Sequence, residues 1–377
     1  MSTSEPVFAC SSCFMNEGLQ LDANRLGMED SSPCPRCAGN DGRKLTASRL
    51  ARLAQEFFVW GSVHRSAYGA APRIQFNGAR ETDIDLPGSL GADKAVFEDV
   101  LGIGFFLYGP RLWMLGEIEP LKALRCAGTR DAVIERIVRE YATRTLAQRD
   151  KFYRIRKDPD EPSHDQQYDS APPGHANGRL DTAEKPALYA SPDFQTCLHE
   201  CRVTAEDDLY AATLSPARDL ELLDVTTLLD EPPEVSEFES LDLAVNMLFL
   251  AGEHSYPITR QLSCAAQEAG LDGIAFPSHF STLRNGVKPF ETTYGLSNRV
   301  IPRYKELEAA KVTTNFAIFG RPIQDGLVDV VCVNRVVLHA VHYSAHFGPV
   351  LGDEQGRPKV RNVGRLGTMP FFRSVAD

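Results

Sequence analysis

Apolar and polar positions follow different periods in the two halves of this 377-residue chain. In the first half, apolar residues recur every three or four positions, which predicts amphipathic helices. From residue 151 onward, short apolar runs such as "ALYAS" and "NFAIFGRPI" predict strands between occasional helices. We therefore expect an α+β fold with a sheet-rich second half. The predicted helices are 44–60, 93–101, 116–124, 129–148, 193–202 and 257–269.

Changes in composition divide the chain into four predicted segments. Residues 1–43 are rich in Cys, Ser, Gly and Pro and have little apolar periodicity. Residues 44–150 are predicted to form a mainly helical module, and residues 151–350 a strand-rich domain. Residues 351–377 are polar, and we expect a loosely ordered tail there.

The first segment carries four cysteines in the pattern C-x2-C-x20-C-x2-C. Two such pairs supply four thiolates for a tetrahedral cation, and this spacing is typical of a zinc ribbon. Four sulfur ligands leave no open coordination position, so the predicted Zn2+ is structural. The predicted metal ligands are Cys10, Cys13, Cys34 and Cys37.

The net charge of −11 argues against a general nucleic-acid-binding protein, which needs a surplus of Lys and Arg. It does not exclude a local pocket built from a few arginines. No run approaches the ~18 apolar residues of a membrane span, and no secretory signal opens the chain. We therefore expect a cytoplasmic protein whose cysteines are reduced or bind metal.

Four polar clusters interrupt the second half: "FYRIR", "NGRLDTAEKPALYAS", "TCLHECR" and "DGIAFPSHF". Their order over residues 151–345 resembles the RES domain, a family named for its arginine, glutamate and serine. The resemblance implies a fold similar to that of the ADP-ribosyltransferases. It also implies an enzyme that consumes NAD+, often as the toxin of a toxin–antitoxin pair.

The family's functional positions fall on Arg154, Arg179, Tyr189, Glu200 and Ser278. Leu180 stands where the family usually has an aromatic residue. The loop before Arg179 is long, and an extra stretch occupies roughly 288–313. These departures affect the expected shape of the pocket mouth more than the expected chemistry.

These residue types suit the cleavage of NAD+. Arg154 and Arg179 could clamp the pyrophosphate, and the ring of Tyr189 could stack on the nicotinamide. Glu200 could stabilise an oxocarbenium-like transition state, and Ser278 could bind phosphate or ribose. We predict catalytic roles for Arg154, Tyr189, Glu200 and Ser278, and NAD+ binding by Arg154, Arg179, Tyr189 and Ser278.

Each of these residues also has an ordinary structural explanation. Glu200, for example, could form a surface ion pair with Arg202 or Lys185. The histidines His164, His175, His199 and His279 lie near the same motifs but include no H-x3-H pair. We interpret them as bystanders, of which His279 is the one worth mutating.

Residues 44–150 resemble the helical segment that precedes some RES domains and is related to the HEPN group. HEPN nucleases need an arginine four to six residues from a histidine, and His64 has no such arginine before it. A ribonuclease is therefore not expected, and a regulatory, dimerising or sensing role is favoured. The motif "YGPRLWMLG", with Tyr108, Arg111 and Trp113, could pack on the catalytic half or bind a ligand.

The sequence therefore predicts an NAD+ glycohydrolase or phosphorylase that acts as a toxin or as an abortive-defence effector. A protein ADP-ribosyltransferase and a non-enzymatic nucleotide- or partner-binding module remain the alternatives. The expected partners are NAD+ and an antitoxin or regulatory protein, and a homodimer stays open. Neither a membrane nor nucleic acid is an expected partner.

Overall fold

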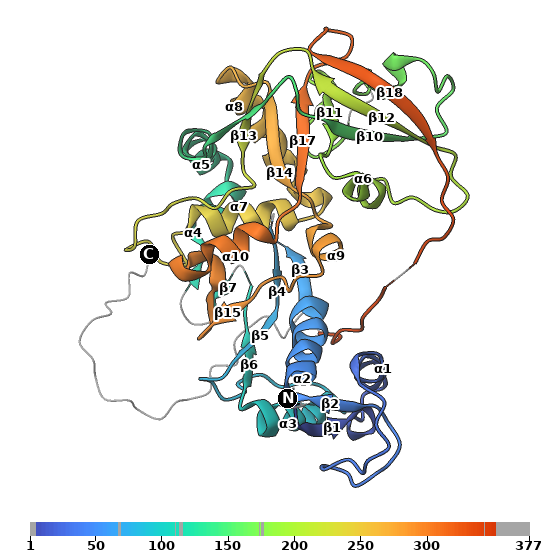
Figure 1. Ribbon diagram of the computed structural model, residues 1–377. Coiled ribbons are helices and arrows are strands. Elements are labelled where there is room, and N and C mark those ends of the chain that lie inside the picture. Colours follow the sequence, from blue (N-terminus) through green and yellow to red (C-terminus); the bar gives the residue numbers. More distant parts are fainter. Residues whose placement is uncertain are drawn as a thin grey trace, which may run out of the picture.

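The computed structural model describes residues 5–66, 69–109, 111–112, 116–172, 174, 177–342 and 344–351. Trp113, His175 and the tail from residue 352 lie outside the described residues. In Figure 1, the sheets of the second half lie above a smaller N-terminal half. No helix among the described residues has the length and apolar character that a membrane crossing requires.

Two sheets form the framework of the second half. The first has five strands in the order β11-β17-β14-β13-β9, and its β13–β14 pair is parallel. The second has three antiparallel strands in the order β10-β12-β18. The bounds are β9 Thr143–Leu146, β10 Phe152–Lys157, β11 Ala187–Ala190, β12 Leu209–Pro216, β13 Leu220–Asp224, β14 Gly273–Pro277, β17 Thr314–Phe319 and β18 Val328–Val336.

Both faces of the five-stranded sheet are covered. One face packs on α5 (Ala127–Glu140), α7 (Leu241–Leu250) and α8 (Tyr256–Glu268), through one cluster of buried apolar side chains. The other face meets the three-stranded sheet through a second cluster that includes Phe152, Leu188 and Phe316. This double burial explains why the central strands read as continuous apolar runs rather than as alternating ones.

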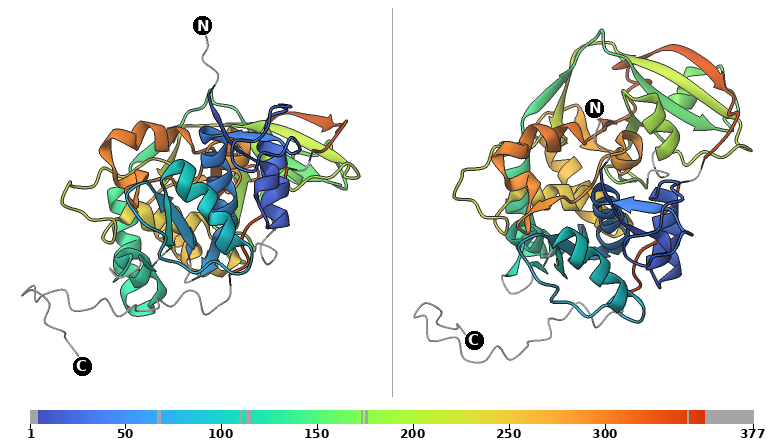
Figure 2. Two further views of the ribbon diagram at one scale, coloured as in Figure 1. Left: turned by 90° about the horizontal axis from the view of Figure 1, so that it is seen from below. Right: turned by 60° about the horizontal axis from the view of Figure 1, so that its bottom comes forward.

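The N-terminal half has its own apolar core around α2 (Ala47–Ala54) and α3 (Leu90–Leu101). The core includes Phe14 and Leu19 from the cysteine-bearing segment, which spans β1 (Val7–Cys10), α1 (Glu17–Leu26) and β2 (Lys44–Thr46). Figure 2, in which the bottom of Figure 1 is turned forward, shows these elements close together. The remaining elements here are β3 Val63–Ser66, β4 Gly69–Pro72, β5 Ile74–Asn77, β6 Gly104–Leu107, β7 Arg111–Leu112, β8 Gly116–Glu117 and α4 Glu119–Arg125.

The helix predicted over 129–148 is wrong at both ends. Helix α5 starts at Ala127, and the Thr129 hydroxyl donates to the carbonyls of Ala123 and Cys126 instead of capping the helix. The helix ends at Glu140, and the residues after it form β9, which pairs with β13. The helical pattern of apolar residues continues in the sequence beyond Glu140. Strand pairing at the edge of the sheet nevertheless decides the structure of these residues.

Two segments of the second half reach back to the first. The extra stretch contains β15 (Thr292–Thr293), β16 (Leu296–Ser297) and α10 (Lys305–Ala310), and it follows α9 (Ser281–Asn285). In it, the Pro289 carbonyl accepts a 2.6 Å hydrogen bond from Gln55 Nε2. The second segment, residues 337–351, is called the strap below. Its Phe347 N–H donates to Asp22 Oδ2 at 2.7 Å.

The division of the chain into four segments, with boundaries at residues 43, 150 and 350, stays a prediction. Helix α5 and strand β9 pack with the sheets of the second half, although both precede residue 151. Tyr108 packs on the second half as well, because its buried hydroxyl donates to Glu237 Oε1 at 2.8 Å.

Replacing Gly348 with alanine is expected to loosen the strap. A Cβ atom there would lie 2.5 Å from the Gly61 carbonyl oxygen, which cannot move aside without moving its backbone. We expect a loss of about 1–3 kcal/mol in the free energy of unfolding and faster proteolysis of the strap. Gly128→Ala is the control, since its Cβ would meet nothing within 4 Å. Equal cleavage rates in the two variants would contradict a close strap contact.

Candidate active site

A backbone bridge joins the edges of the two sheets, and a cavity opens beside it. Tyr153 of β10 and Ser191, which follows β11, exchange backbone hydrogen bonds of 2.8 and 3.0 Å. The cavity has a volume of about 790 Å³, within the usual range of ligand sites of about 300–1,000 Å³. Among the predicted residues, Arg154, Arg179, Tyr189 and Glu200 line it.

Arg154 and Arg156 enter the cavity from one face of β10, since they are two residues apart on a strand. Their guanidinium groups donate to backbone carbonyls, and both reach the carbonyl of Asp169. Burial, followed by the nearby charge of Arg156, lowers the pKa of Arg154 to about 9. Arg154 therefore stays protonated at neutral pH.

Arg179 forms a second cationic wall. Its guanidinium donates to the Ala251 carbonyl at 2.5 Å and to the Leu248 carbonyl at 3.3 Å. Its guanidinium carbon also lies 5.1 Å from the centre of the Tyr256 ring. Burial lowers the pKa of Arg179. Among the described residues, no carboxylate forms an ion pair with Arg154, Arg156 or Arg179, so the cavity carries uncompensated positive charge.

Tyr189 ties the arginine-bearing turn to the sheet. Its hydroxyl accepts from the Leu180 N–H at 2.7 Å and donates to Asp181 Oδ1 at 3.2 Å. Gly178 allows this approach, because a Cβ there would lie 2.7 Å from the hydroxyl. The Tyr189 ring packs edge-on against Phe276, with the ring centres 6.3 Å apart.

Tyr189→Phe is expected to destabilise the protein by about 1–3 kcal/mol, because the Leu180 N–H loses its acceptor. The loosened turn should also weaken any ligand contact of Arg179. Denaturant unfolding measures the first effect. Tyr294→Phe is the control, because Tyr294 is 77% exposed. Equal stability of both variants would show that the hydroxyl does not hold the turn.

Glu200 is the last residue of α6 (Phe194–Glu200), a short helix whose N-cap Asp193 accepts from the Thr196 N–H. Its side chain is exposed to the cavity. Oε1 accepts two hydrogen bonds of 2.6 Å, from Ser278 Oγ and Asn315 Nδ2. No described residue binds Oε2. The ion pair with Arg202 or Lys185 that the sequence left open is not among the interactions of the described residues.

Ser278 is placed differently from the sequence prediction. Its side chain is 1% exposed and does not line the main cavity. The hydroxyl donates to Glu200 and accepts from the Phe280 N–H at 3.1 Å. Ser278 therefore orients the carboxylate, and its predicted contact with phosphate or ribose has no support in this geometry.

Sequence reasoning missed three residues of the cavity: Arg65, Arg156 and Asn315. Arg156 was predictable, because it lies two residues after Arg154 and alternate residues of a strand share one face. Asn315 is a polar residue within the apolar run of β17, which is a weaker signal. No pattern near Arg65 pointed to the cavity. His279 also lines the cavity, and burial followed by the charge of Arg65 lowers its pKa.

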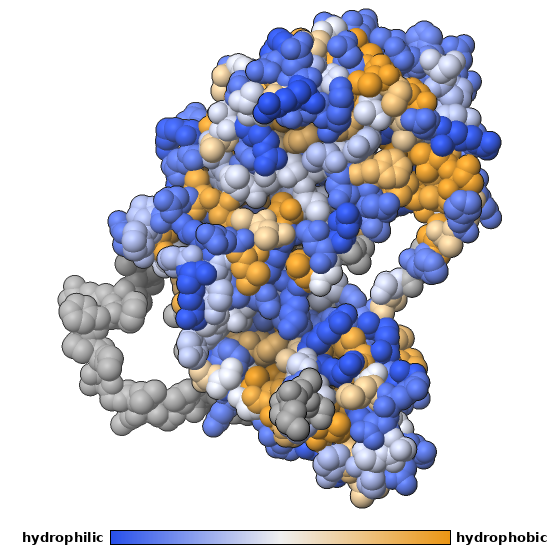
Figure 3. All heavy atoms as spheres, in the orientation of Figure 1, coloured by the Kyte–Doolittle hydropathy of each residue, from blue (hydrophilic) through white to orange (hydrophobic). Residues whose placement is uncertain are grey.

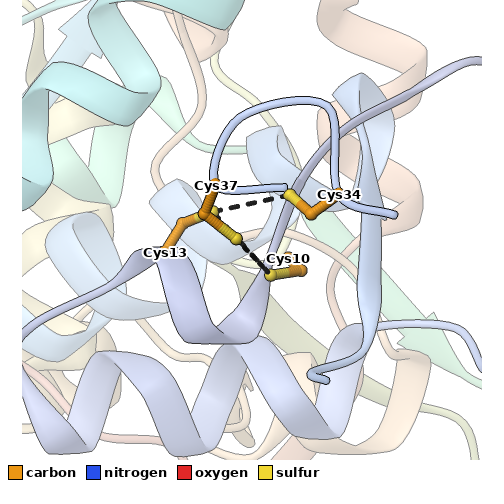
Figure 4. Close-up of side chains that lie close together, drawn as sticks. All are labelled: Cys10, Cys13, Cys34 and Cys37. Atoms are coloured by element: carbon orange, nitrogen blue, oxygen red, sulfur yellow. Dashed lines mark hydrogen bonds between the residues drawn. The ribbon is translucent and has the colours of Figure 1, made fainter. Parts of the chain in front are cut away.

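The four predicted metal ligands form one cluster. Their sulfur atoms all lie within 4.8 Å of one another, with separations of 3.6 Å for Cys10–Cys37, 3.7 Å for Cys13–Cys34 and 3.8 Å for Cys10–Cys13. Figure 4 shows the four side chains pointing toward one another. A tetrahedral zinc with Zn–S bonds of about 2.3 Å would separate its sulfurs by about 3.8 Å. The residues therefore fit a zinc ribbon.

In comparisons with known proteins, part of the second half matches a protein family. Residues 151–287 match the family model described as the RES domain. A solved chain from the M. tuberculosis MbcT–MbcA toxin–antitoxin complex is 14% identical, and the match covers 55% of this chain and 93% of that chain with a TM-score of 0.32. No curated protein matches the chain. Strands β17 and β18, which complete the two sheets, lie beyond the matched residues.

Proposed function

We propose that this protein, whose residues 151–287 form a RES domain, cleaves the bond between nicotinamide and ribose in NAD+. The observation that carries the proposal is one cavity that combines arginines without counter-ions and a single anchored carboxylate. A dinucleotide has matching features, namely a doubly charged pyrophosphate and a glycosidic bond that gains positive charge as it breaks.

The arginines supply binding. A pyrophosphate would enter a space where Arg154, Arg156 and Arg179 already hold positive charge, so it would replace no protein anion. Their donors to backbone carbonyls fix each guanidinium before a ligand arrives. Such preorganisation reduces the entropy cost of binding.

Glu200 supplies transition-state stabilisation. As the C–N bond breaks, its electron pair moves to the pyridinium nitrogen, and nicotinamide leaves as a neutral molecule that needs no acid. The sugar is left with positive charge, which Oε2 of Glu200 could face while Ser278 and Asn315 hold Oε1. Water would then give ADP-ribose and a proton, whereas phosphate would give ADP-ribose phosphate.

Incubating the full-length protein with NAD+, with and without phosphate, tests this proposal. Released nicotinamide together with ADP-ribose would support a glycohydrolase, and a phosphorylated product would support a phosphorylase. ADP-ribose attached to protein would favour the transferase alternative. Intact NAD+ that stays bound would contradict cleavage and favour a binding module.

A protein that depletes NAD+ needs restraint, so we also propose a cytoplasmic toxin or defence effector with an antitoxin or regulatory partner. An apolar area lies over α6 and the end of β18 (Figure 3), where Phe194, Leu198 and Leu338 are partly buried. Induced expression in bacteria tests toxicity. Growth arrest by the wild type but not by Glu200→Gln is expected.

A further inference from the structure

One wall of the candidate active site comes from outside the RES domain. Arg65 belongs to β3 of the N-terminal half, and its side chain lines the main cavity. In Figure 1, β3 and β4 rise from the N-terminal half toward α7. The hairpin packs against both α4 and α7, because a Cβ on Gly69 would lie 2.9 Å from Leu121 of α4 and 3.5 Å from Met247 of α7.

Arg65 lies beside Arg179 across a single turn. A Cβ on Gly252 would lie 3.1 Å from Arg65 Nη1 and 3.3 Å from its Cδ, so the side chain runs along this backbone. The preceding residue, Ala251, accepts the hydrogen bond from Arg179 Nη2. Burial is the main cause that lowers the pKa of His279, and the positive charges of Arg65 and Arg179 lower it further.

The guanidinium of Arg65 is available to a ligand. Arg154, Arg156 and Arg179 donate to backbone carbonyls. Among the described residues, the side chain of Arg65 has neither a hydrogen bond nor an ion pair, and it lines the cavity with an exposed surface. Arg202 shares this property on another part of the wall, but it belongs to the RES domain itself.

We propose that Arg65 binds a phosphate group of the substrate, so that the N-terminal half completes the active site of the RES domain. This inference rests on the proposed function, because it assigns the residue to the same dinucleotide. Arg65 and Arg179 would bind the pyrophosphate from two sides of the turn at residues 251–252. The N-terminal half is then part of the catalytic unit, beyond any separate regulatory role.

The docking of the N-terminal half is firm enough for this role. His254 contacts the Gly69 carbonyl, with Nε2 at 3.3 Å, which fixes the hairpin close to Arg65. The ring of Phe290, in the extra stretch, lies 5.9 Å from Trp60, just before β3. The strap adds a third contact through Gly348 and Gly61. These contacts surround the strand that carries Arg65.

Binding of ADP-ribose to full-length protein tests the inference apart from turnover. Arg65→Gln is expected to weaken ADP-ribose binding by about 10- to 100-fold, the effect of losing a charged hydrogen bond. The KM for NAD+ should rise similarly, with a smaller change in kcat. Arg65→Lys should keep part of the affinity, since lysine retains the positive charge but lacks the paired N–H donors with which a guanidinium binds phosphate.

Arg139→Gln is the matched control, because it removes one positive charge from helix α5, outside the lining of the cavity, at a side chain that is 67% exposed. Nicotinamide riboside, which has no phosphate, serves as a second probe and should be cleaved equally by wild type and Arg65→Gln. ADP-ribose binding by Arg65→Gln within twofold of wild type would overturn the inference. So would a wild type that binds no ADP-ribose.

The two proposals can fail separately. If wild type binds ADP-ribose and Arg65→Gln does not, but neither releases nicotinamide, the phosphate contact stands and the proposed cleavage falls. If wild type cleaves NAD+ and Arg65→Gln has an unchanged KM, the cleavage stands and the role of Arg65 falls.

Discussion

Glu200→Gln is expected to lower the rate of NAD+ cleavage by at least about 100-fold, the scale on which loss of one stabilising group acts. A neutral amide cannot compensate the positive charge that develops on the ribose. The amide oxygen can still accept from Ser278 and Asn315, so the local geometry should persist. Chromatography of released nicotinamide at saturating NAD+ measures the rate.

The design separates chemistry from folding. Glu200 is exposed, so its neutral replacement should leave the thermal unfolding of the protein near that of wild type. Glu206→Gln is the matched control, since it removes the same charge from the exposed loop that follows α6. A Glu200→Gln enzyme with more than a tenth of the wild-type rate would exclude Glu200 as the stabilising carboxylate.

Loss of zinc is expected to unfold the cysteine-bearing segment. Structural zinc stabilises small zinc domains by about 10–16 kcal/mol. The buried apolar side chains of β1, α1 and β2 belong to a cluster that they share with α2 and α3. Chelation or Cys34→Ser should therefore expose Phe14 and Leu19. Hydrogen exchange over residues 5–46 measures the change, and elemental analysis should find one zinc per chain.

Cys332→Ser is the control for this experiment. Cys332 is exposed on β18 and lies outside the cluster, so its replacement should change neither the metal content nor the exchange. A metal-free protein with wild-type exchange over the same residues would sink the proposal of a zinc-dependent fold.

Local spacing made part of this protein predictable. Cysteine pairs predicted the ribbon, and the four sulfurs converge as a tetrahedral ion requires. The order of motifs predicted a RES domain, which the family match at residues 151–287 confirms. The α+β class is confirmed too, because strands buried on both faces carry continuous apolar runs that a sequence displays directly.

Roles that depend on partners from distant strands were not predictable in this way. Ser278 was expected to face the ligand, but it orients Glu200 together with Asn315, a residue of β17 that sequence reasoning missed. The predicted site roles stay predictions, while the structure places four of the five residues around one cavity. Oε2 of Glu200 stays free because Ser278, which follows β14, and Asn315 of β17 both donate to Oε1.

The sequence by itself determined the four-cysteine cluster and the α+β class, because cysteine spacing and apolar periodicity can be read along single segments. The candidate residues of the second half came from the resemblance to the RES domain, and their roles stay predictions. Tertiary structure alone decided that helix α5 gives way to β9, since the strand is stabilised by its pairing with β13. It also decided that Arg65 reaches the cavity, because that position follows from how the N-terminal half packs on α7 and its following turn.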